Sequence, residues 1–311
     1  MTKIAIIDMG TNTFHLLLAE ISQEGYQVVF RDHEAVKIGM AGINEGYITA
    51  AGCERAIRSM KKFRKTIDQN AITRIYAFGT SALRSAKNGA ALAQEITSLT
   101  GIPIQIITGD QEADLIFAGV KAALDLGQDA NLVMDIGAGS VEFVIGDWQG
   151  VTWKESVEIG GQRLLEKFQQ HDPITPQEIK ALDSFFEKAL GSLQKALEKF
   201  QPNVLIGSSG TFDTLSDIFC IRQKIPRTFE ESETPLSHEG FYEIYQELIR
   251  KNRNERMQID GMIALRVDMI VVACCLIRFI LEKHTFNRIR VSTYSLKEGV
   301  LAKFADEYKN K

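Results

Sequence analysis

Asp135-Ile-Gly-Ala-Gly-Ser-Val-Glu142 lies between two apolar runs, Leu132-Val-Met134 before it and Phe143-Val-Ile-Gly146 after it. An apolar run, a glycine-rich turn and a second apolar run predict a β-hairpin. Glycines let the backbone come close to an anion, and the N–H groups of a turn can bind phosphate oxygens. The carboxylates at the two ends of the turn are ligands that Mg²⁺ takes when it also holds a phosphate. Taken alone, the segment is equally compatible with an ordinary glycine-rich hairpin.

A second copy of this pattern stands near the N-terminus, at Ile4-Ala-Ile-Ile-Asp-Met-Gly-Thr-Asn-Thr-Phe-His-Leu-Leu-Leu18. The equivalent positions are Asp8 and Asp135, Gly10 and Gly137, and Thr13 and Ser140. Two such loops about half a chain apart indicate a duplicated α/β unit of βββαβα order, with a cleft between the copies. That organisation is typical of the actin-like (ribonuclease H-like) phosphotransferase fold, in which two hairpins grip a phosphate chain from opposite sides.

Length and composition describe a two-domain globular protein. The chain has 311 residues, of which 45% are hydrophobic and 24% charged. We expect an N-terminal domain over residues 1–126 and a C-terminal domain over 127–294, with a last helix over 295–311 that packs back on the first domain. The net charge of −4 argues against a nucleic-acid polymer as partner.

The cysteines and the most apolar segment indicate where in the cell the protein is expected. Cys53, Cys220, Cys274 and Cys275 have no metal or disulfide spacing, which fits a reducing cytoplasm. No signal-peptide pattern precedes Asp8. The apolar segment 262–280 contains three charged residues, and its longest uncharged stretch is far short of the roughly 20 residues that span a bilayer. It therefore predicts a buried helix, no membrane partner and a cytoplasmic protein.

Hydrophobic periodicity, caps and turn residues predict the remaining elements. In the first half, strands are expected over residues 3–9, 14–21, 26–37, 74–78 and 104–107, and helices over 50–68, 89–99 and 111–124. In the second half, strands are expected over 131–136, 141–146, 151–158, 203–206 and 288–292, and helices over 161–168, 176–200, 238–251, 260–283 and 295–308, with one more after residue 211. Thr49 and Thr175 are the expected N-caps, and residues 79–84 and 221–236 are expected as a turn and an exposed loop.

Four Gly/Ser/Thr-rich turns follow strands, at the end of the sheet where ligands bind in α/β proteins. The predicted phosphate-binding or substrate-binding residues of these turns are Gly10, Thr11, Asn12, Thr13, Thr80, Ser81, Gly137, Ala138, Gly139, Ser140, Ser209, Gly210 and Thr211. Basic residues that would contact the same anion are Arg84, Arg163 and Arg266. Asp8, Asp135 and Glu142 are the predicted Mg²⁺ ligands.

Glu112 is the predicted catalytic base. Hydrolysis of a phosphoanhydride needs a carboxylate that helps take a proton from the attacking water. Glu112 lies in the first turn of the helix expected between the two hairpin units, and a helix N-terminus favours the ionised carboxylate. A routine glutamate at the start of a helix has the same local pattern, so this prediction depends on the other turns.

Six segments, in chain order, resemble the successive signatures of the exopolyphosphatase / guanosine pentaphosphate phosphohydrolase (Ppx/GppA) family in its short, two-domain form. They are Asp8-Met-Gly-Thr-Asn-Thr-Phe-His15, Gly79-Thr-Ser-Ala-Leu-Arg84, Gln111-Glu-Ala-Asp-Leu-Ile-Phe-Ala-Gly-Val120, Asp135-Ile-Gly-Ala-Gly-Ser-Val-Glu142, Gly207-Ser-Ser-Gly-Thr211 and Tyr294-Ser-Leu-Lys-Glu-Gly299. The resemblance implies Mg²⁺-dependent removal of the terminal phosphate from inorganic polyphosphate or from guanosine pentaphosphate (pppGpp).

The resemblance also assigns roles by position. It places the family's catalytic glutamate on Glu112, its first-loop aspartate on Asp8 and its acidic pair on Asp135 and Glu142. Its phosphate-loop glycines fall on Gly10, Gly137, Gly139 and Gly210. The chain departs from the family pattern at four positions: Gln111 and Asp114 stand where the pattern has Glu and Arg, and Ala138 and Val141 stand where it has Gly and Thr.

Two other readings remain open at this point. An ATPase or kinase on the same scaffold would use the turn Gly207–Thr211 for a nucleotide. A non-catalytic sensor of polyphosphate or of an alarmone would bind without needing Glu112. The sequence leaves the oligomeric state undecided, a homodimer included.

Overall fold

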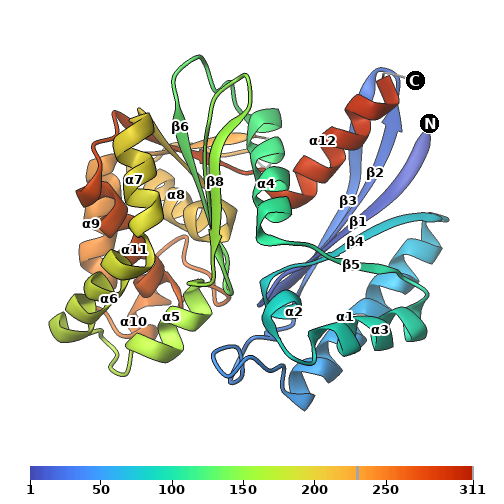
Figure 1. Ribbon diagram of the computed structural model, residues 1–311, viewed down its shortest axis with the longest axis horizontal. Coiled ribbons are helices and arrows are strands. Elements are labelled where there is room, and N and C mark those ends of the chain that lie inside the picture. Colours follow the sequence, from blue (N-terminus) through green and yellow to red (C-terminus); the bar gives the residue numbers. More distant parts are fainter. Residues whose placement is uncertain (229–230, 310–311) are drawn as a thin grey trace. The chain divides into compact units, whose positions relative to one another are not determined.

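The computed structural model describes residues 1–228 and 231–309, and it divides into two compact units (Figure 1). Unit 1 comprises Met1–Gly119 with Leu296–Lys311, and unit 2 comprises Val120–Ser295. The division expected after residue 126 therefore lies after Gly119, inside a helix.

Unit 1 is built on a five-stranded sheet in the order β3-β2-β1-β4-β5. Its strands are β1 (Thr2–Met9), β2 (Thr13–Ser22), β3 (Gly25–Ala35), β4 (Arg74–Gly79) and β5 (Ile104–Ile106). Its helices are α1 (Ala50–Gln69), α2 (Ser81–Ser85), α3 (Gly89–Thr100), α4 (Gly109–Ala123) and α12 (Leu296–Lys309). Strand β1 pairs antiparallel with β2 and parallel with β4.

Both faces of β1 are buried, which explains its continuous apolar sequence. Ala5, Ile7 and Met9 join the core that also contains side chains of α1 and α3. Ile4 and Ile6, whose side chains alternate to the opposite face, are also buried. Helix α12 packs on β1, β2 and β3, within unit 1.

Unit 2 is built on a six-stranded sheet in the order β10-β11-β9-β6-β7-β8. Its strands are β6 (Asn131–Ile136), β7 (Val141–Gly146), β8 (Val151–Val157), β9 (Val204–Ser208), β10 (Glu233–Leu236) and β11 (Arg288–Ser292). Its helices are α5 (Gly161–Phe168), α6 (Pro176–Ala189), α7 (Gly191–Phe200), α8 (Ser209–Gln223), α9 (His238–Leu248), α10 (Arg253–Arg256) and α11 (Ile270–Lys283).

The two sheets repeat one topology. Strands β3, β2, β1, β4 and β5 of unit 1 correspond in order and direction to β8, β7, β6, β9 and β11 of unit 2. Strand β10 is an addition at the edge of the second sheet. This is the duplicated actin-like α/β fold that the two hairpin patterns predicted.

Both predicted N-caps are confirmed. Thr49 accepts a hydrogen bond from the backbone N–H of Gly52, at 3.2 Å, and α1 begins at the next residue. Thr175 and Glu178 form a reciprocal capping box at the start of α6, with Pro176 in the first helical position.

Two helix predictions are wrong. Residues 81–85 form the short helix α2, where a turn was expected, and Ala82 and Leu83 are buried in the core of unit 1. The helix expected over 176–200 is two helices, because Leu190 leaves helical geometry (φ −110°, ψ 21°) and Gly191 starts a new helix. Glycine is a poor helix former, and Leu190 gains full burial at the break.

The loop expected over 221–236 is also partly wrong, and its residues 229 and 230 lie outside the described part of the chain. Helix α8 continues to Gln223, and residues 233–236 form β10, which pairs with β11 alone. Pro235 argued against a strand, but an edge strand tolerates a residue without an N–H. At the other end of α8, the turn expected over 207–211 is divided between two elements, since β9 extends through Ser208 and α8 begins at Ser209.

The helix expected over 260–283 begins ten residues later, at Ile270. Gly261 has a φ of +95°, which is unfavourable for a residue in a right-handed helix, and turns occupy most of the segment before α11. Helix α11 is buried along most of its length, as the apolar sequence predicted. Within the described residues, no helix combines the length and hydropathy required to cross a bilayer.

The carboxylate of Glu178, in the capping box of α6, makes the stability of the fold depend on pH in the acidic range. Burial raises the pKa of this carboxylate, but hydrogen bonds from the Thr175 N–H, the His171 side chain, the Gln170 N–H and the Thr175 hydroxyl lower its pKa from 4.5 to about 2. A carboxylate with a depressed folded-state pKa stabilises the fold above its unfolded pKa, and this contribution is lost as pH falls towards the folded value. We therefore expect the stabilisation from Glu178 to decline between about pH 4.5 and pH 2.

Glu178→Gln should remove this part of the pH dependence. The free energy of unfolding of the variant, from denaturant titration, should lie below that of the wild type at pH 6, and the gap should narrow by pH 3. Exposed Glu198 on α7 provides the control, since Glu198→Gln should track the wild type at both pH values. A gap that stays constant with pH would contradict the assignment.

Candidate functional site

The two hairpin loops have the same backbone geometry. The N–H of Gly10 donates to the carbonyl of Thr13 at 3.1 Å, and the N–H of Gly137 donates to the carbonyl of Ser140 at 3.1 Å. A Cβ atom at Gly10 or Gly137 would lie 2.9 or 3.0 Å from the same carbonyl oxygen. The loops are therefore tight turns that favour glycine at both equivalent positions, as the repeated pattern predicted.

The first loop, between β1 and β2, contains three consecutive polar residues with buried side chains. Thr11, Asn12 and Thr13 are all buried. In the described part of the chain, the hydroxyls of Thr11 and Thr13 have no hydrogen-bond partner. Buried polar groups are normally paired, so these two hydroxyls are consistent with a site that binds a polar ligand.

The second loop, between β6 and β7, is held by the start of α5. The carbonyls of Gly139, Gly137 and Ala138 accept, in turn, the N–H groups of residues 160, 161 and 162. A Cβ at Gly160 would lie 2.4 Å from the backbone of Ala138. Arg163 donates to the Gly139 carbonyl at 2.8 Å and to Glu158 at 2.9 Å. The predicted anion contact Arg163 thus also supports the loop that contains the other predicted residues.

Glu112 and Arg84 form an ion pair inside unit 1. The Arg84 Nη1 donates to the Glu112 Oε2 at 2.7 Å and to the Ile107 carbonyl at 3.3 Å. Glu112 is only 7% exposed, in the first turn of α4. Arg84 is placed by α2, the helix that sequence reasoning missed. Thr80, which follows β4, donates its hydroxyl to the Met9 carbonyl at 3.4 Å, and Ser81 is buried.

The acidic pair of unit 2 lies on neighbouring strands. Asp135 on β6 is directly opposite Glu142 on β7, and both are nearly fully buried. Asp8 occupies the position in unit 1 equivalent to Asp135, opposite His15 on β2. Among residues 1–228 and 231–309, no group of three or more His, Cys, Asp or Glu side chains is arranged to hold a metal ion. Two buried carboxylates nevertheless fit Mg²⁺, which completes its coordination with water and substrate phosphates.

The turn from β9 to α8 carries the last set of predicted residues. Ser209 has a φ of +69°, a conformation that is unfavourable for residues other than glycine. Gly210 is in contact with Arg266, because a Cβ there would lie 2.2 Å from the guanidinium. Burial lowers the pKa of Arg266, and the carboxylates of Asp213 and Asp135 act in the opposite direction. The structure therefore brings together Ser209, Gly210, Arg266 and Asp135 within unit 2.

Sequence reasoning missed three serines that bind the acidic pair. Ser208 and Ser295 donate to Asp135, and Ser156 donates to Glu142 at 2.7 Å. Ser208 and Ser295 lie in segments that the family resemblance had marked, but neither of these two serines was assigned a role. Ser156 had no signal, since only the pairing of β7 with β8 places it opposite Glu142.

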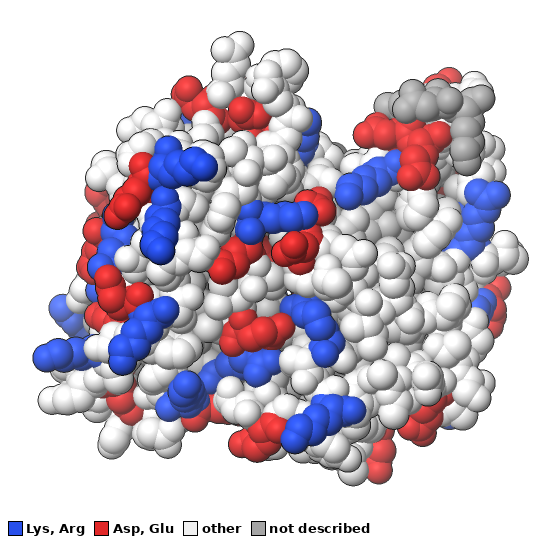
Figure 2. All heavy atoms as spheres, in the orientation of Figure 1, with Lys and Arg blue, Asp and Glu red and all other residues white. Residues whose placement is uncertain are grey.

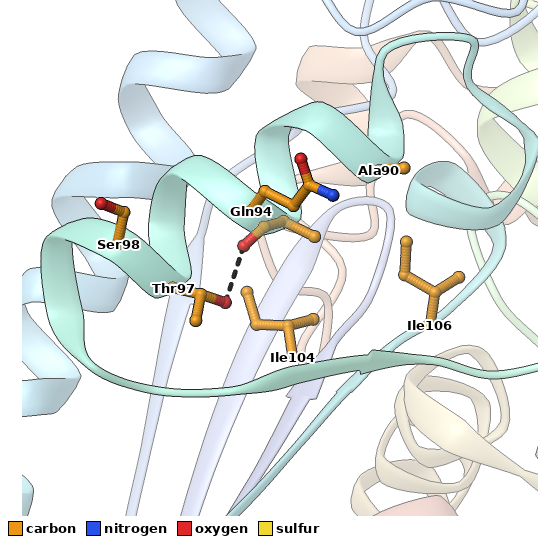
Figure 3. A pocket seen from close by; sticks show the side chains of 7 residues that line it. Ala90, Gln94, Thr97, Ser98, Ile104 and Ile106 are labelled. Carbon is orange, nitrogen blue, oxygen red and sulfur yellow. Dashed lines mark hydrogen bonds between the residues drawn. The ribbon is translucent and has the colours of Figure 1, made fainter.

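Two other surface features lie outside the predicted site residues. A groove of about 440 Å³ lies between α3 and β5, and its lining contains no charged side chain: Ala90, Ala93, Gln94, Thr97, Ser98, Ile104 and Ile106 (Figure 3). Thr97 is already hydrogen-bonded to the Ala93 carbonyl. On the face drawn in Figure 2, acidic and basic side chains are interspersed, in keeping with the net charge of −4.

The fold is a duplicated actin-like fold with an Asp-x-Gly loop in each unit and a buried glutamate at the start of a helix. This combination is typical of the proteins of this fold that act on phosphate groups. The chain belongs to the Ppx/GppA phosphatase family, whose family model matches residues 17–307.

Alignments with known relatives cover most of this chain. A bifunctional 3-dehydroquinate synthase/phosphatase of Fusobacterium nucleatum is 33% identical over 294 residues, which cover 89% of this chain and 43% of that protein. The chain therefore spans less than half the length of that relative. Exopolyphosphatase 1 of Mycobacterium tuberculosis is 23% identical over 308 residues, 98% of this chain and 88% of that protein. The crystal structure of an exopolyphosphatase from Cytophaga hutchinsonii is 42% identical with a TM-score of 0.95, over 98% of each chain.

Proposed function

We propose that the chain is a phosphoanhydride hydrolase that releases terminal orthophosphate from inorganic polyphosphate, from pppGpp, or from both. Membership of the phosphatase family and the likeness to exopolyphosphatases support this reaction class. One observation carries the mechanism: Glu112 is buried at the start of α4 and yet keeps a charged partner, Arg84, at 2.7 Å.

In this mechanism Glu112 accepts a proton from the attacking water. A carboxylate beside a guanidinium and in the first turn of a helix is held in its ionised form, which is the form that accepts a proton. Arg84 fixes the orientation of the carboxylate. The N–H groups of the loops at Gly10–Thr13 and Gly137–Ser140, with Arg266, would stabilise negative charge on the phosphate oxygens.

Mg²⁺ belongs to the same proposal, with Asp135 and Glu142 as its ligands in unit 2 and Asp8 as the ligand in unit 1. When bound, the ion would neutralise charge on the phosphoryl oxygens. The buried, directly opposed carboxylates of β6 and β7 support this role, since buried charges are normally paired or bound to a metal.

The test is release of orthophosphate from long-chain polyphosphate and from pppGpp, assayed side by side. We expect release in the presence of Mg²⁺, a fall to background with excess EDTA, and recovery when Mg²⁺ is added back beyond the chelator. The better substrate identifies the branch of the family. Release that is insensitive to EDTA would contradict the metal, and the absence of release with intact binding would favour the sensor instead.

A kinase or ATPase of the same fold is separated by the fate of the phosphate. A hydrolase transfers it to water, so ¹⁸O from labelled water appears in the released orthophosphate. Transfer to an added acceptor, with no ¹⁸O in the product, would overturn the proposal in favour of a kinase.

A further inference from the structure

Three serine hydroxyls converge on one oxygen of Asp135. The Oδ2 atom accepts from Ser208 at 2.9 Å, from Ser209 at 2.6 Å and from Ser295 at 2.7 Å. The three serines come from two segments: Ser208 and Ser209 lie at the junction of β9 and α8, and Ser295 is the last residue of unit 2. Ser208 is also the direct neighbour of Asp135 across the β6–β9 pair.

These bonds divide the carboxylate into two unequal oxygens. A carboxylate oxygen offers about two lone pairs, so three hydroxyl donors saturate Oδ2. These three side-chain hydrogen bonds all go to Oδ2. A cation that used Oδ2 would have to displace a hydroxyl, whereas Oδ1 carries none of these bonds.

The opposing carboxylate repeats the arrangement. Ser156 on β8 lies directly across from Glu142 and donates to its Oε1 at 2.7 Å. Each member of the acidic pair therefore has one oxygen bound by at least one serine hydroxyl.

The bond from Ser209 to Asp135 is made by a residue whose backbone conformation is unfavourable. Ser209 has a φ of +69°, in the left-handed region that favours glycine. Glycine at this position would relieve the backbone but would lack the hydroxyl. Strained residues persist where the surrounding structure holds them in place, often because they serve a function. Here the function we infer is the hydrogen bond from the Ser209 hydroxyl to Asp135.

We propose that Ser208, Ser209, Ser295 and Ser156 are specificity-determining residues that select Mg²⁺ over Ca²⁺. Mg²⁺ requires a compact octahedron and takes carboxylates through single oxygens, whereas Ca²⁺ accommodates more ligands and bidentate carboxylates. The three serines that saturate Oδ2 exclude the bidentate mode at Asp135, and Ser156 makes it less favourable at Glu142, so the four serines disfavour Ca²⁺. This inference rests on the proposed function, because it takes Asp135 and Glu142 as the cation ligands.

The test measures binding of the metals themselves to the full chain. Mn²⁺ is bound first and its free concentration followed by electron paramagnetic resonance, and Mg²⁺ or Ca²⁺ is then added to displace it, with and without saturating inorganic phosphate. For wild type, Mg²⁺ should displace Mn²⁺ at lower concentration than Ca²⁺. In the double variant Ser209→Gly with Ser295→Ala, which leaves only Ser208 on Oδ2, the ratio of the Ca²⁺ to the Mg²⁺ dissociation constant should fall by roughly tenfold, the scale on which partners of metal ligands act.

Two comparisons separate selectivity from folding. Ser216 is a fully buried serine of α8 whose hydroxyl donates to the Pro235 carbonyl at 2.7 Å, so Ser216→Ala removes a comparable bond away from Asp135 and should keep the wild-type ratio. Ser209→Gly relieves the positive φ, so adding it to Ser295→Ala should maintain or raise the melting temperature while selectivity falls. A purely structural serine would not produce these opposite changes.

The outcomes distinguish the two proposals. If the wild type binds Mn²⁺ and the ratio is unchanged in the double variant, the selectivity role is overturned and the proposed function stands. If the wild type binds no Mn²⁺, with or without phosphate, the metal ligands of the proposed function are wrong and the selectivity role is overturned with them.

Discussion

Glu112→Gln is expected to lower kcat for phosphate release by roughly 10²–10⁴-fold, the usual contribution of a positioned general base. Substrate affinity should change little, because the amide keeps the size of the carboxylate and can still accept a hydrogen bond from Arg84, at 2.7 Å in the wild type. Steady-state assays with polyphosphate and pppGpp, together with direct titration of substrate binding, measure the two quantities separately.

The matched control is Asp110→Asn, which makes the same carboxylate-to-amide change at an exposed position in the first turn of α4. Its kcat should stay within about threefold of wild type, since an exposed charge near a helix N-terminus contributes only a few tenths to about 1 kcal/mol. Because Glu112→Gln also removes the charge that faces Arg84, its melting temperature should be recorded and activity assayed well below it. Full turnover by a folded Glu112→Gln protein would exclude Glu112 as the base.

Gly299→Ala is expected to destabilise unit 1 by about 1–3 kcal/mol, the range for forcing extra atoms into a well-packed interior. A Cβ at Gly299 would lie 1.8 Å from the carbonyl oxygen of Leu115 and 2.8 Å from the N atom of Gly119. Both atoms belong to the backbone of α4, and they are four residues apart, the spacing of a helical hydrogen bond. No side-chain rotation can relieve this contact, so α12 must move away from α4.

Thermal unfolding should show the effect as a lower melting temperature. Gly191→Ala is the control, because a Cβ there meets no heavy atom within 4 Å and alanine is the better helix former at the start of α7. Its melting temperature should equal or exceed that of wild type. A Gly299→Ala protein that melts with the wild type would mean that α12 and α4 are not so closely packed.

Local patterns in the sequence predicted the elements on which the site is built. The apolar runs on each side of Gly10 and Gly137 determined two hairpins with the same 3.1 Å turn bond. Threonines at 49 and 175 determined two helix starts. These features depend on interactions between residues a few positions apart, which is why periodicity, turn residues and caps reveal them.

The errors have a common origin in long-range packing. Pro235 lies in a strand because β11 offers an edge, and the break at Leu190 gains a fully buried leucine. Neither partner is near in sequence. Short-range propensity cannot anticipate such contacts, since burial against distant elements outweighs it.

The sequence by itself determined the duplicated fold, the two glycine loops, and Asp135, Glu142 and Glu112 as candidates for chemistry. Only the tertiary structure decided what surrounds each of them. Ser208 and Ser295 reach Asp135 from 73 and 160 residues away, Arg84 meets Glu112 through a helix that looked like a turn, and Gly299 is required by the backbone of α4. The physical reason is that a residue's period and turn chemistry are written in its neighbours, whereas its partners are set by how the elements pack.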